Sequence, residues 1–453
     1  MKSINELTET QIIKQEKTKR FHKEKKEKAF GEIMEATGES KQEILKKIRA
    51  INEKEIIRIV VTQFAKFEIY KKNERETEEF LYLLAKRDQL KEELKSLFKE
   101  IDDGLLDYED IECKINEFYE VVGKTLTDKY KKEITIPYRP DLVKEEAELD
   151  RISTDLEISR ILLGFTLAEY YTFRFFEKSL KQKREYLTDK ERKRVLCVLN
   201  NAESQDILKD KAKCYQILKD YFRREQIVID KPEDAGLLKE FCIKRKVFVK
   251  KPFAESFGRG IEPVKVDENT DYKVLTETLL SECGKFVAEE LIIPHRKMKA
   301  LNPDSINTVR LETYYNGEKT EFVSAFMRIG KSGSFVDNGG AGGIGVFIDI
   351  STGTVISDGH DEMGRIYETH PTTGVRFRGF KIPNWKKALK LGREIADKVP
   401  GASYIGWDLT YTNRWKWIVV EGNGTPQYIF NQGTAEKGFR KEFLEKFDRK
   451  ENG

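Results

Sequence analysis

The chain has 453 residues, enough for two or three domains, and its 83 Lys and Arg residues nearly balance 79 Asp and Glu residues. This balance argues against a nucleic-acid-binding protein, and five scattered cysteines without a Cys-x-x-Cys pair argue against a disulfide framework or a zinc site. The N-terminal residues lack the apolar core of a signal peptide, and no apolar run of about 18 residues could span a membrane, so we expect a soluble, cytoplasmic protein.

The first part of the chain is predicted to be helical and charged. In residues 1–150 apolar residues recur at spacings of three and four, which predicts a separate helical domain. The first residues, about 25, are so charged that they could fray or remain disordered. The exposed helical faces could dimerise or bind a partner, although a solvated scaffold is the simpler explanation. Residues 125–142 break the pattern and form a candidate linker, and residues 151–225 form a helical lead-in to the next domain.

After about residue 225 the sequence pattern changes. Short runs rich in β-branched and aromatic residues, such as KVFVKKP and TEFVSAFMRIG, are separated by turns in which glycine is frequent. One amphipathic helix remains, at NWKKALKLGREIADKVP. Strands this close together favour hairpins. We therefore predict an α+β domain with a largely antiparallel sheet over residues 226–445.

Two apolar runs near the C-terminus each carry an acidic residue. YIGWDLTYT contains Asp408, and KWIVVEGNGTP ends in Glu421 and Asn423, which point to the same side because strand residues alternate. If the runs form a hairpin that turns near Arg414 and Trp415, Asp408 lies opposite Glu421. Facing carboxylates repel each other, so we expect a positive group between them.

The segment VFVKKPFAESFGRGI combines a strand, two lysines and a glycine loop. A loop with Gly258 and Gly260 lets backbone N–H groups close around phosphate oxygens, while a lysine at the strand end supplies a positive charge. Of the two lysines, we expect Lys251 to face the phosphates and Lys250 to matter less, because adjacent strand residues point to opposite faces. A hairpin loop with solvated lysines would also explain this pattern.

The segment FVAEELIIPHRK carries Glu289 and Glu290 at a strand end, followed by Leu291 and Ile292. The backbone of such an edge could hydrogen-bond adenine, and an acidic side chain could bind the ribose hydroxyls or the exocyclic amine. Taken alone, the segment is more simply a strand that leaves the core.

The order and spacing of these segments resemble the ATP-grasp superfamily. More closely, PDSINTVRLETY, MRIGKSGSFVDNGGAGGIGVFIDISTG and YIGWDLTYT…VVEGNGTP resemble its sugar-transfer-associated branch, and the resemblance runs from about residue 155 to about residue 440. It implies an ATP-grasp fold, in which two α+β subdomains hold the nucleotide, preceded here by an α-helical N-terminal domain. It also implies ATP and Mg²⁺ as cofactors.

The resemblance assigns roles to individual residues. Asp408, Glu421 and Asn423 would hold Mg²⁺, and Lys211 in DKAKCYQILKDYF would reach the nucleotide phosphates. Magnesium prefers hard oxygen ligands and usually binds one or two carboxylates together with substrate phosphates. Mg²⁺ is then the positive group expected between the facing acids.

Three further residues are candidates for catalysis. Arg310 in NTVRLETY and Arg328 in FMRIG sit on strands expected to face the same cleft, where a guanidinium could hold a transferring phosphate or a substrate carboxylate. An ion pair at the edge of the core is the alternative for each. Asp337 and Asn338 begin the loop DNGGAGGIG, whose glycines give it the flexibility to close over phosphates or substrate, and Asn338 is the third candidate.

The resemblance implies an ATP- and Mg-dependent ligase that joins a carboxylate to an amine through an acyl phosphate. The association with sugar transfer suggests small-molecule or glycan-linked substrates. A phosphotransferase on the same fold is an alternative, because the nucleotide half would be the same. A nucleotide-sensing binding module is a third, which the full set of metal ligands argues against.

Overall fold

The computed structural model describes residues 74–253 and 258–448. The disorder predicted for the first residues lies outside these ranges. The chain divides after Gln89, and the residues from Leu90 onward form one compact unit. No helix in the described ranges combines the length and apolar character that a membrane span requires.

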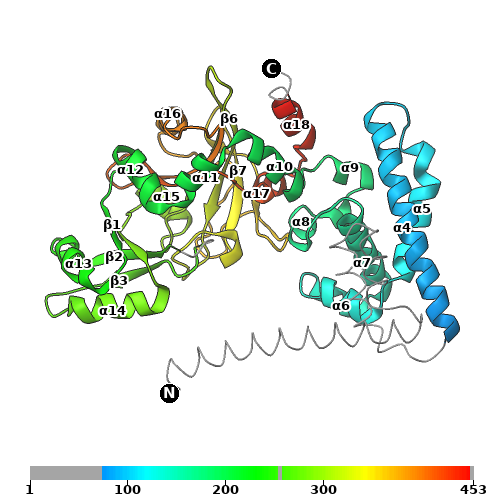
Figure 1. The fold of residues 1–453 in the computed structure, drawn as a ribbon, viewed down its shortest axis with the longest axis horizontal. Coiled ribbons are helices and arrows are strands. Elements are labelled where there is room, and N and C mark those ends of the chain that lie inside the picture. The colour runs from blue at the N-terminus through cyan, green and yellow to red at the C-terminus, as the bar shows by residue number, and fades with distance from the viewer. Residues whose placement is uncertain (1–73, 254–257, 449–453) are drawn as a thin grey trace, which may run out of the picture. The chain divides into compact units, whose positions relative to one another are not determined.

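Helices make up the first part of the described chain, as predicted, and appear in blue to green in Figure 1. They are α4 (Glu74–Asp102), α5 (Glu112–Lys124), α6 (Asp128–Thr135), α7 (Glu146–Ile161), α8 (Leu167–Thr172), α9 (Leu180–Arg184), α10 (Asp189–Leu199), α11 (Ala202–Lys209) and α12 (Lys211–Phe222). Helices α8, α9 and α10 each begin with a capping box, in which a Ser or Thr and the residue three positions later satisfy each other's backbone N–H groups. Whether the charged helices bind a partner stays a prediction.

The candidate linker at residues 125–142 was a wrong interpretation. This stretch contains α6 and packs on α7, because Ile134 and Leu142 are buried in the same apolar cluster as Ile152 and Leu156. Its prolines end one helix and begin a short 3₁₀ turn, which interrupts the helical periodicity without separating two domains.

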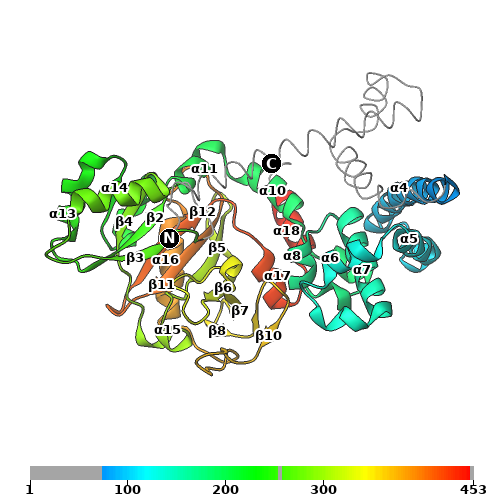
Figure 2. The ribbon, with the colours of Figure 1, turned by 90° about the horizontal axis from the view of Figure 1, so that it is seen from below.

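The smaller of two sheets has four antiparallel strands in the order β1-β4-β2-β3. Its strands are β1 (Gln226–Ile229), β2 (Val247–Pro252), β3 (Glu262–Lys265) and β4 (Phe286–Glu290). Two helices, α13 (Ala235–Cys242) and α14 (Tyr272–Cys283), supply apolar side chains to the core of this subdomain. Figure 2 shows both helices beside the sheet.

The larger sheet follows the order β10-β9-β7-β6-β5-β11-β12, with β8 beside β7, and its strand pairs are antiparallel. Its strands are β5 (Val309–Tyr315), β6 (Thr320–Ile329), β7 (Ile344–Asp349), β8 (Thr354–Val355), β9 (Gly359–His360), β10 (Ile366–Tyr367), β11 (Tyr404–Tyr411) and β12 (Trp417–Asn423). The predicted amphipathic helix is α16 (Trp385–Ala396), which buries its apolar side in the core of this sheet.

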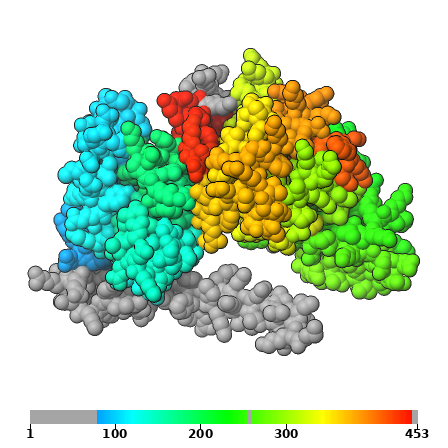
Figure 3. All heavy atoms as spheres, turned by 180° about the vertical axis from the view of Figure 1, so that it is seen from behind, coloured from blue at the N-terminus to red at the C-terminus, as the bar shows by residue number. Residues whose placement is uncertain are grey.

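Three more helices complete the subdomain of the larger sheet. They are α15 (Arg296–Leu301), α17 (Ile429–Ala435) and α18 (Arg440–Asp448). In the space-filling view of Figure 3 the green small-sheet subdomain adjoins the yellow and orange larger-sheet subdomain. The fold is thus α+β with two subdomains after a helical segment, as the sequence predicts.

Candidate functional site

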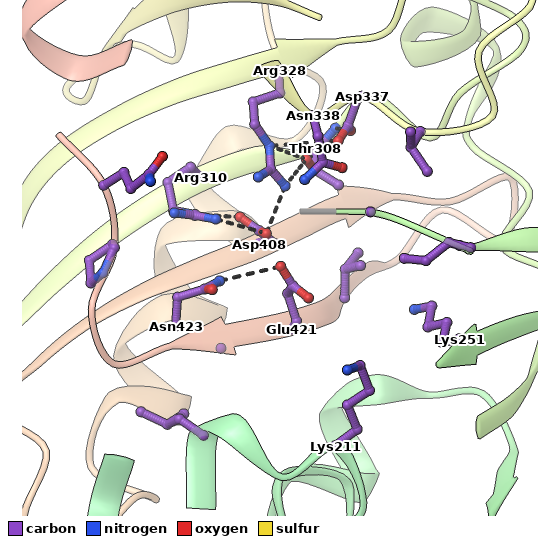
Figure 4. Close-up of a pocket in the computed structure, with 18 of the residues that line it drawn as sticks. Lys211, Lys251, Thr308, Arg310, Arg328, Asp337, Asn338, Asp408, Glu421 and Asn423 are labelled. Carbon is purple, nitrogen blue, oxygen red and sulfur yellow. Dashed lines mark hydrogen bonds and ion pairs between the residues drawn. The ribbon is translucent and has the colours of Figure 1, made fainter. Parts of the chain in front are cut away.

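A cavity of about 670 Å³ is lined by residues of both sheets and of helices α10 to α12. The small sheet contributes β2 and β4, and the larger sheet contributes β5, β6, β11 and β12. Figure 4 shows how the charged side chains from these elements point toward one space. Most of the predicted site residues line this cavity.

Lys251 and Lys250 point to opposite faces of β2. The Lys251 Nζ lies 2.9 Å from both carboxylate oxygens of Glu289 on β4, and both side chains line the cavity. Lys250 is buried on the other face, where its Nζ lies 2.5 Å from Glu262 and 3.1 Å from Glu282. The expected alternation is therefore present, and Lys251 is the lysine on the cavity side.

A second cation, which sequence reasoning missed, also holds Glu289. Arg224, just before β1, places its Nε 2.8 Å from Glu289 Oε1. The same guanidinium donates to the backbone carbonyls of Val419 and Val420 on β12 of the larger sheet. Burial alone would raise the pKa of Glu289, but Arg224 and Lys251 outweigh it and lower this pKa below its ordinary value. The Arg224 guanidinium therefore links the Glu289 carboxylate of the small sheet to β12 of the larger sheet.

Lys211 reaches the cavity from the first turn of α12. Asp210 caps this helix by accepting from the N–H groups of Ala212 and Lys213. The Lys211 Nζ donates to the Phe253 carbonyl at 3.4 Å, beside the start of the glycine loop. Burial lowers the pKa of Lys211, and Glu421 partly opposes that shift. Such a desolvated ammonium is suited to a phosphate.

The glycine loop approaches the second predicted loop closely. At Gly258, φ is +75° and an added Cβ would lie 2.7 Å from Asn338 Oδ1, so the position favours glycine on both counts. Gly258 and Asn338 line the cavity together. Gly260 also has a positive φ, but it packs against Pro252 and does not line the cavity.

The strand end predicted to bind adenine has some residues in the cavity and one on the outer surface. Leu291 and Ile292 line the cavity with Glu289. Glu290 does not line it, because its neighbours are Arg414, 3.3 Å away, and Arg245, 4.0 Å away. Glu290 is thus not placed to contact a nucleotide in this cavity, contrary to the prediction from the sequence, because strand alternation turns it away from the side of Glu289.

Two arginines hold Asp408 on the floor of the cavity. Arg310 on β5 pairs with both oxygens of Asp408 on β11, and Arg328 on β6 donates from Nη2 to Asp408 Oδ2 at 2.7 Å. Asp408 is fully buried. Burial alone would raise its pKa, but Arg310 and Arg328 lower this pKa below its ordinary value. The arginines therefore form ion pairs and also line the cavity.

Arg328 is oriented by Thr308, which sequence reasoning missed, and by Asp337, which the sequence indicated only as the start of the second loop. Thr308 Oγ1 accepts from Arg328 Nη2 at 2.9 Å, and Asp337 Oδ1 lies 3.6 Å from Arg328 Nε. Asp337 also accepts from the backbone N–H and the hydroxyl of Thr308, at 2.7 and 2.8 Å. These contacts set the direction of the guanidinium.

The predicted hairpin is present, and it pairs Asp408 with Glu421 across β11 and β12. Glu421 is exposed to the cavity, and its neighbour Asn423 donates to Glu421 Oε1 at 3.4 Å. Burial among the cavity walls raises the pKa of Glu421, and the facing carboxylate of Asp408 raises it further. The positive groups at Asp408 are the two arginines, while Glu421 remains in need of a counter-charge.

The donor set of Asp408, Glu421 and Asn423 fits Mg²⁺. It offers hard oxygen atoms, and a divalent cation would relieve the repulsion that raises the Glu421 pKa. No cluster of three His, Cys, Asp or Glu residues suited to a metal occurs in the part of the chain that the structure describes. A cation here would therefore need substrate phosphates to complete its shell.

One buried acid on the same face of β5 as Arg310 has no cationic partner within ion-pair distance in the described structure. Glu312 Oε2 accepts from Tyr404, Ser324 and Asn431 at 2.7, 2.9 and 2.8 Å, while its Oε1 lacks a hydrogen-bond partner. Burial raises the pKa of Glu312, and these hydrogen bonds and Arg310 offset only part of the shift. Glu312 does not line the cavity.

The arrangement of side chains in the cavity can bind a polyanion and stabilise negative charge on it. Lys211 and Lys251 line one side of the cavity, Arg310 and Arg328 line another, and Glu421 faces the space among them. Cations placed around a carboxylate with hard oxygen atoms are suited to phosphoryl transfer, since that chemistry depends on positioning and electrostatics.

Comparisons with known proteins agree with this picture. A family model described as sugar-transfer associated ATP-grasp matches residues 191–449, more than half of the chain. No curated protein matches the sequence.

Similarity to solved structures is low in sequence and in superposition. The chain resembles the ATP-grasp ligase PsnB complexed with a minimal precursor (13% identity, 55% of this chain, 63% of that chain, TM-score 0.35). It also resembles that ligase complexed with a minimal precursor, Mg and ADP (13% identity, 55% of this chain, 61% of that chain, TM-score 0.34). A third similar structure is D-alanine–D-alanine ligase from Bacillus anthracis (14% identity, 56% of this chain, 72% of that chain, TM-score 0.36). The chain covers less than two thirds of the length of PsnB.

Proposed function

The chain belongs to the sugar-transfer associated ATP-grasp family, and from this premise we propose that it is an ATP- and Mg²⁺-dependent ligase that joins a carboxylate to an amine. The substrates are small molecules or groups attached to a glycan. One observation carries the proposal: a single cavity brings the cationic side chains of Lys211, Lys251, Arg310 and Arg328 around an acidic hairpin, whose Glu421 carboxylate forms no ion pair among the described residues.

The reaction proceeds in two steps that need no enzyme nucleophile. A carboxylate oxygen of the first substrate attacks the γ-phosphorus of ATP, which forms an acyl phosphate and releases ADP. The amine nitrogen of the second substrate then attacks the acyl carbon, the bond from carbon to the phosphate oxygen breaks, and phosphate leaves. The amine loses one proton in this step.

The residues of the cavity act by binding and orientation. Lys211 and Lys251 hold the phosphates of ATP, and Arg310 and Arg328 face the transferring phosphoryl group while Asp408 fixes their position. Asn338 and Gly258 line the phosphate side of the cavity. Mg²⁺ bound by Glu421, Asn423 and Asp408 would supply positive charge to the phosphate oxygens during the transfer.

The proposal is tested with purified protein, Mg-ATP, and panels of carboxylates (amino acids, hexuronic acids, short peptides) and amines (amino acids, amino sugars, diamines). We expect ADP and free phosphate to accumulate only when a carboxylate and an amine are both present, with a new amide detected by mass spectrometry. Phosphate labelled at the γ position that remains on a product would instead indicate a phosphotransferase. ADP formation that needs neither substrate would contradict both.

A further inference from the structure

An acidic side chain that the mechanism leaves unused also lines the cavity. Glu362 lies in the loop after β9 and is half-buried. Its Oε1 lies so close to Gly339 that an added Cβ at that glycine would collide with it, and the same Cβ would collide with the ring of Phe430. Gly339 directly follows Asn338. The loop that carries Asn338 thus connects the phosphate side of the cavity to Glu362.

The carboxylate of Glu362 differs from that of its neighbour. Asp361 is fully engaged, since it accepts from the N–H groups of Met363 and Arg365 at 2.9 and 3.0 Å and from the Tyr367 hydroxyl at 2.9 Å. Within the described ranges, no hydrogen bond or ion pair engages the carboxylate of Glu362. Asp361 therefore shapes the loop, and Glu362 is available to a ligand in the cavity.

The loop that carries Glu362 is held from outside by helix α8 and the residues after it. Thr172 Oγ1 donates to the Glu362 carbonyl at 3.1 Å, and Arg174 Nη1 donates to the Gly364 carbonyl at 3.2 Å. Gly364 has φ of +75° and presses against the backbone of Tyr171, so it accommodates no side chain. These contacts fix the backbone on both sides of Glu362.

Burial raises the pKa of Glu362, and the charge of Asp361 adds to the shift. Charged groups near the loop include Lys331, whose Nζ lies 3.9 Å from Asp361, Arg174, and Arg365 within the loop itself. A half-buried carboxylate with a raised pKa is a better proton acceptor than an ordinary glutamate.

We propose that Glu362 binds the ammonium group of the acceptor substrate and accepts the proton that this group must lose before it attacks. The inference rests on the proposed ligase function. As the resulting amine nitrogen forms its bond to the acyl carbon, the electron pair of the breaking carbon–oxygen bond leaves with phosphate, and phosphate takes the second N–H proton. The ring of Phe430 beside Gly339 supplies an apolar wall for the carbon chain that bears the amine.

Hydroxylamine separates the role of Glu362 as a proton acceptor from ATP binding and acyl phosphate formation. It is largely neutral at neutral pH and traps an acyl phosphate as a hydroxamate without help from a base, whereas an alkyl amine, with a pKa of about 10, is protonated and needs a proton acceptor. The experiment compares wild type, Glu362→Gln and Glu368→Gln with Mg-ATP and the carboxylate panel. Each protein receives either hydroxylamine or an amine that wild type accepts. Glu368 is the matched control, because it is exposed and does not line the cavity.

We expect Glu362→Gln to form hydroxamate within about twofold of wild type and to form amide at least about 10²-fold more slowly, in the range typical of a lost general base. Glu368→Gln should match wild type in both assays. Equal loss of hydroxamate and amide in Glu362→Gln, or unchanged amide formation, would overturn the assignment. Failure of wild type to form hydroxamate with any carboxylate would overturn the ligase function itself, and the Glu362 assignment with it.

Discussion

Two buried carboxylates, one on each wall of the cavity, are built alike but differ in one neighbour. On the small sheet, Glu289 lies between Arg224 and Lys251. On the larger sheet, Asp408 lies between Arg310 and Arg328. Both acids have a pKa below the ordinary value.

The difference is the second acid on the larger sheet. Glu421 faces Asp408 across the hairpin and has a raised pKa. The small-sheet wall has two cations for one carboxylate. The larger-sheet wall has three carboxylates, those of Asp408, Glu421 and Asp337, for two guanidinium groups, so it has one carboxylate in excess. An excess acid costs stability unless a cation binds, so the comparison identifies the wall that is built for a ligand.

The largest effect is expected for Glu421→Gln. This change should lower Mg-dependent turnover by at least roughly 10³-fold, because a bound metal supplies several kcal/mol of charge stabilisation and an amide holds it poorly. Without ligand, the melting temperature should hold or rise, since the repulsion toward Asp408 is removed. The gain in melting temperature on adding Mg-ATP should shrink. A protein that keeps the full Mg-ATP shift and activity would show that this acid is structural.

The next largest effect is expected for Asp408→Asn. This change leaves Arg310 and Arg328 without their buried counter-ion and should cost about 3–5 kcal/mol of unfolding free energy. Denaturant unfolding without ligand measures it, with Glu421→Gln as the matched variant on the facing strand. Equal stability of the two variants would contradict the distinction between the paired and the excess acid.

On the small sheet, Lys251→Ala should lower turnover by roughly 10²-fold, as removal of one preorganised charge-stabilising donor typically does. Lys250→Ala is the control on the opposite face of the same strand, and it should leave turnover within about threefold, because its partners Glu262 and Glu282 lie outside the cavity. Steady-state kinetics of both variants measure these two losses of turnover. The reverse ranking would mean that Lys250 faces the nucleotide.

The smallest effect concerns pH and compares Glu289 with Glu312, a buried acid of the larger sheet without a paired cation. The ordinary pKa of both is 4.5; it is lowered in Glu289 and raised in Glu312. The stability from Glu289 is therefore present above pH 4.5 and is lost as pH falls through its lowered pKa. The stability from Glu312 is present below pH 4.5 and is lost as pH rises through its raised pKa.

Melting temperatures of Glu289→Gln and Glu312→Gln, measured from acidic to neutral pH without ligand, check these signs. As pH rises, the melting temperature of Glu289→Gln should fall relative to that of wild type. The melting temperature of Glu312→Gln should rise relative to that of wild type. Each trend should amount to about 2–4 °C per kcal/mol of linked stability. Trends of the same sign in both variants would contradict the assigned charge states.

Sequence reasoning succeeded where the determining contacts are local. The pairing of Asp408 with Glu421 follows from a short hairpin, and the side of β2 that carries Lys251 follows from alternation. The same alternation could have separated Glu289 from Glu290, which points away from the cavity. The sequence alone placed both acids at the nucleotide because either one fits a strand end.

The residues that sequence reasoning missed are brought together by contacts between distant segments. Arg224 precedes β1, yet it binds Glu289 and the backbone of β12. Asp337, which the sequence indicated only as part of a loop, contacts Arg328 directly and also through Thr308. Glu362 shares no motif with the other site residues, and its place in the cavity depends on how the loop after β9 meets the glycines after Asn338. No spacing along the chain signals such contacts.

The anchoring of the loop by Thr172 and Arg174 joins two parts of the chain. Both anchors precede residue 191, where the match to the family begins, whereas Glu362, Lys211 and Lys251 lie within it. Residues outside the family match thus hold the backbone beside Glu362. A substitution at either anchor would act on the cavity wall that carries Glu362 rather than on Lys211 or Lys251.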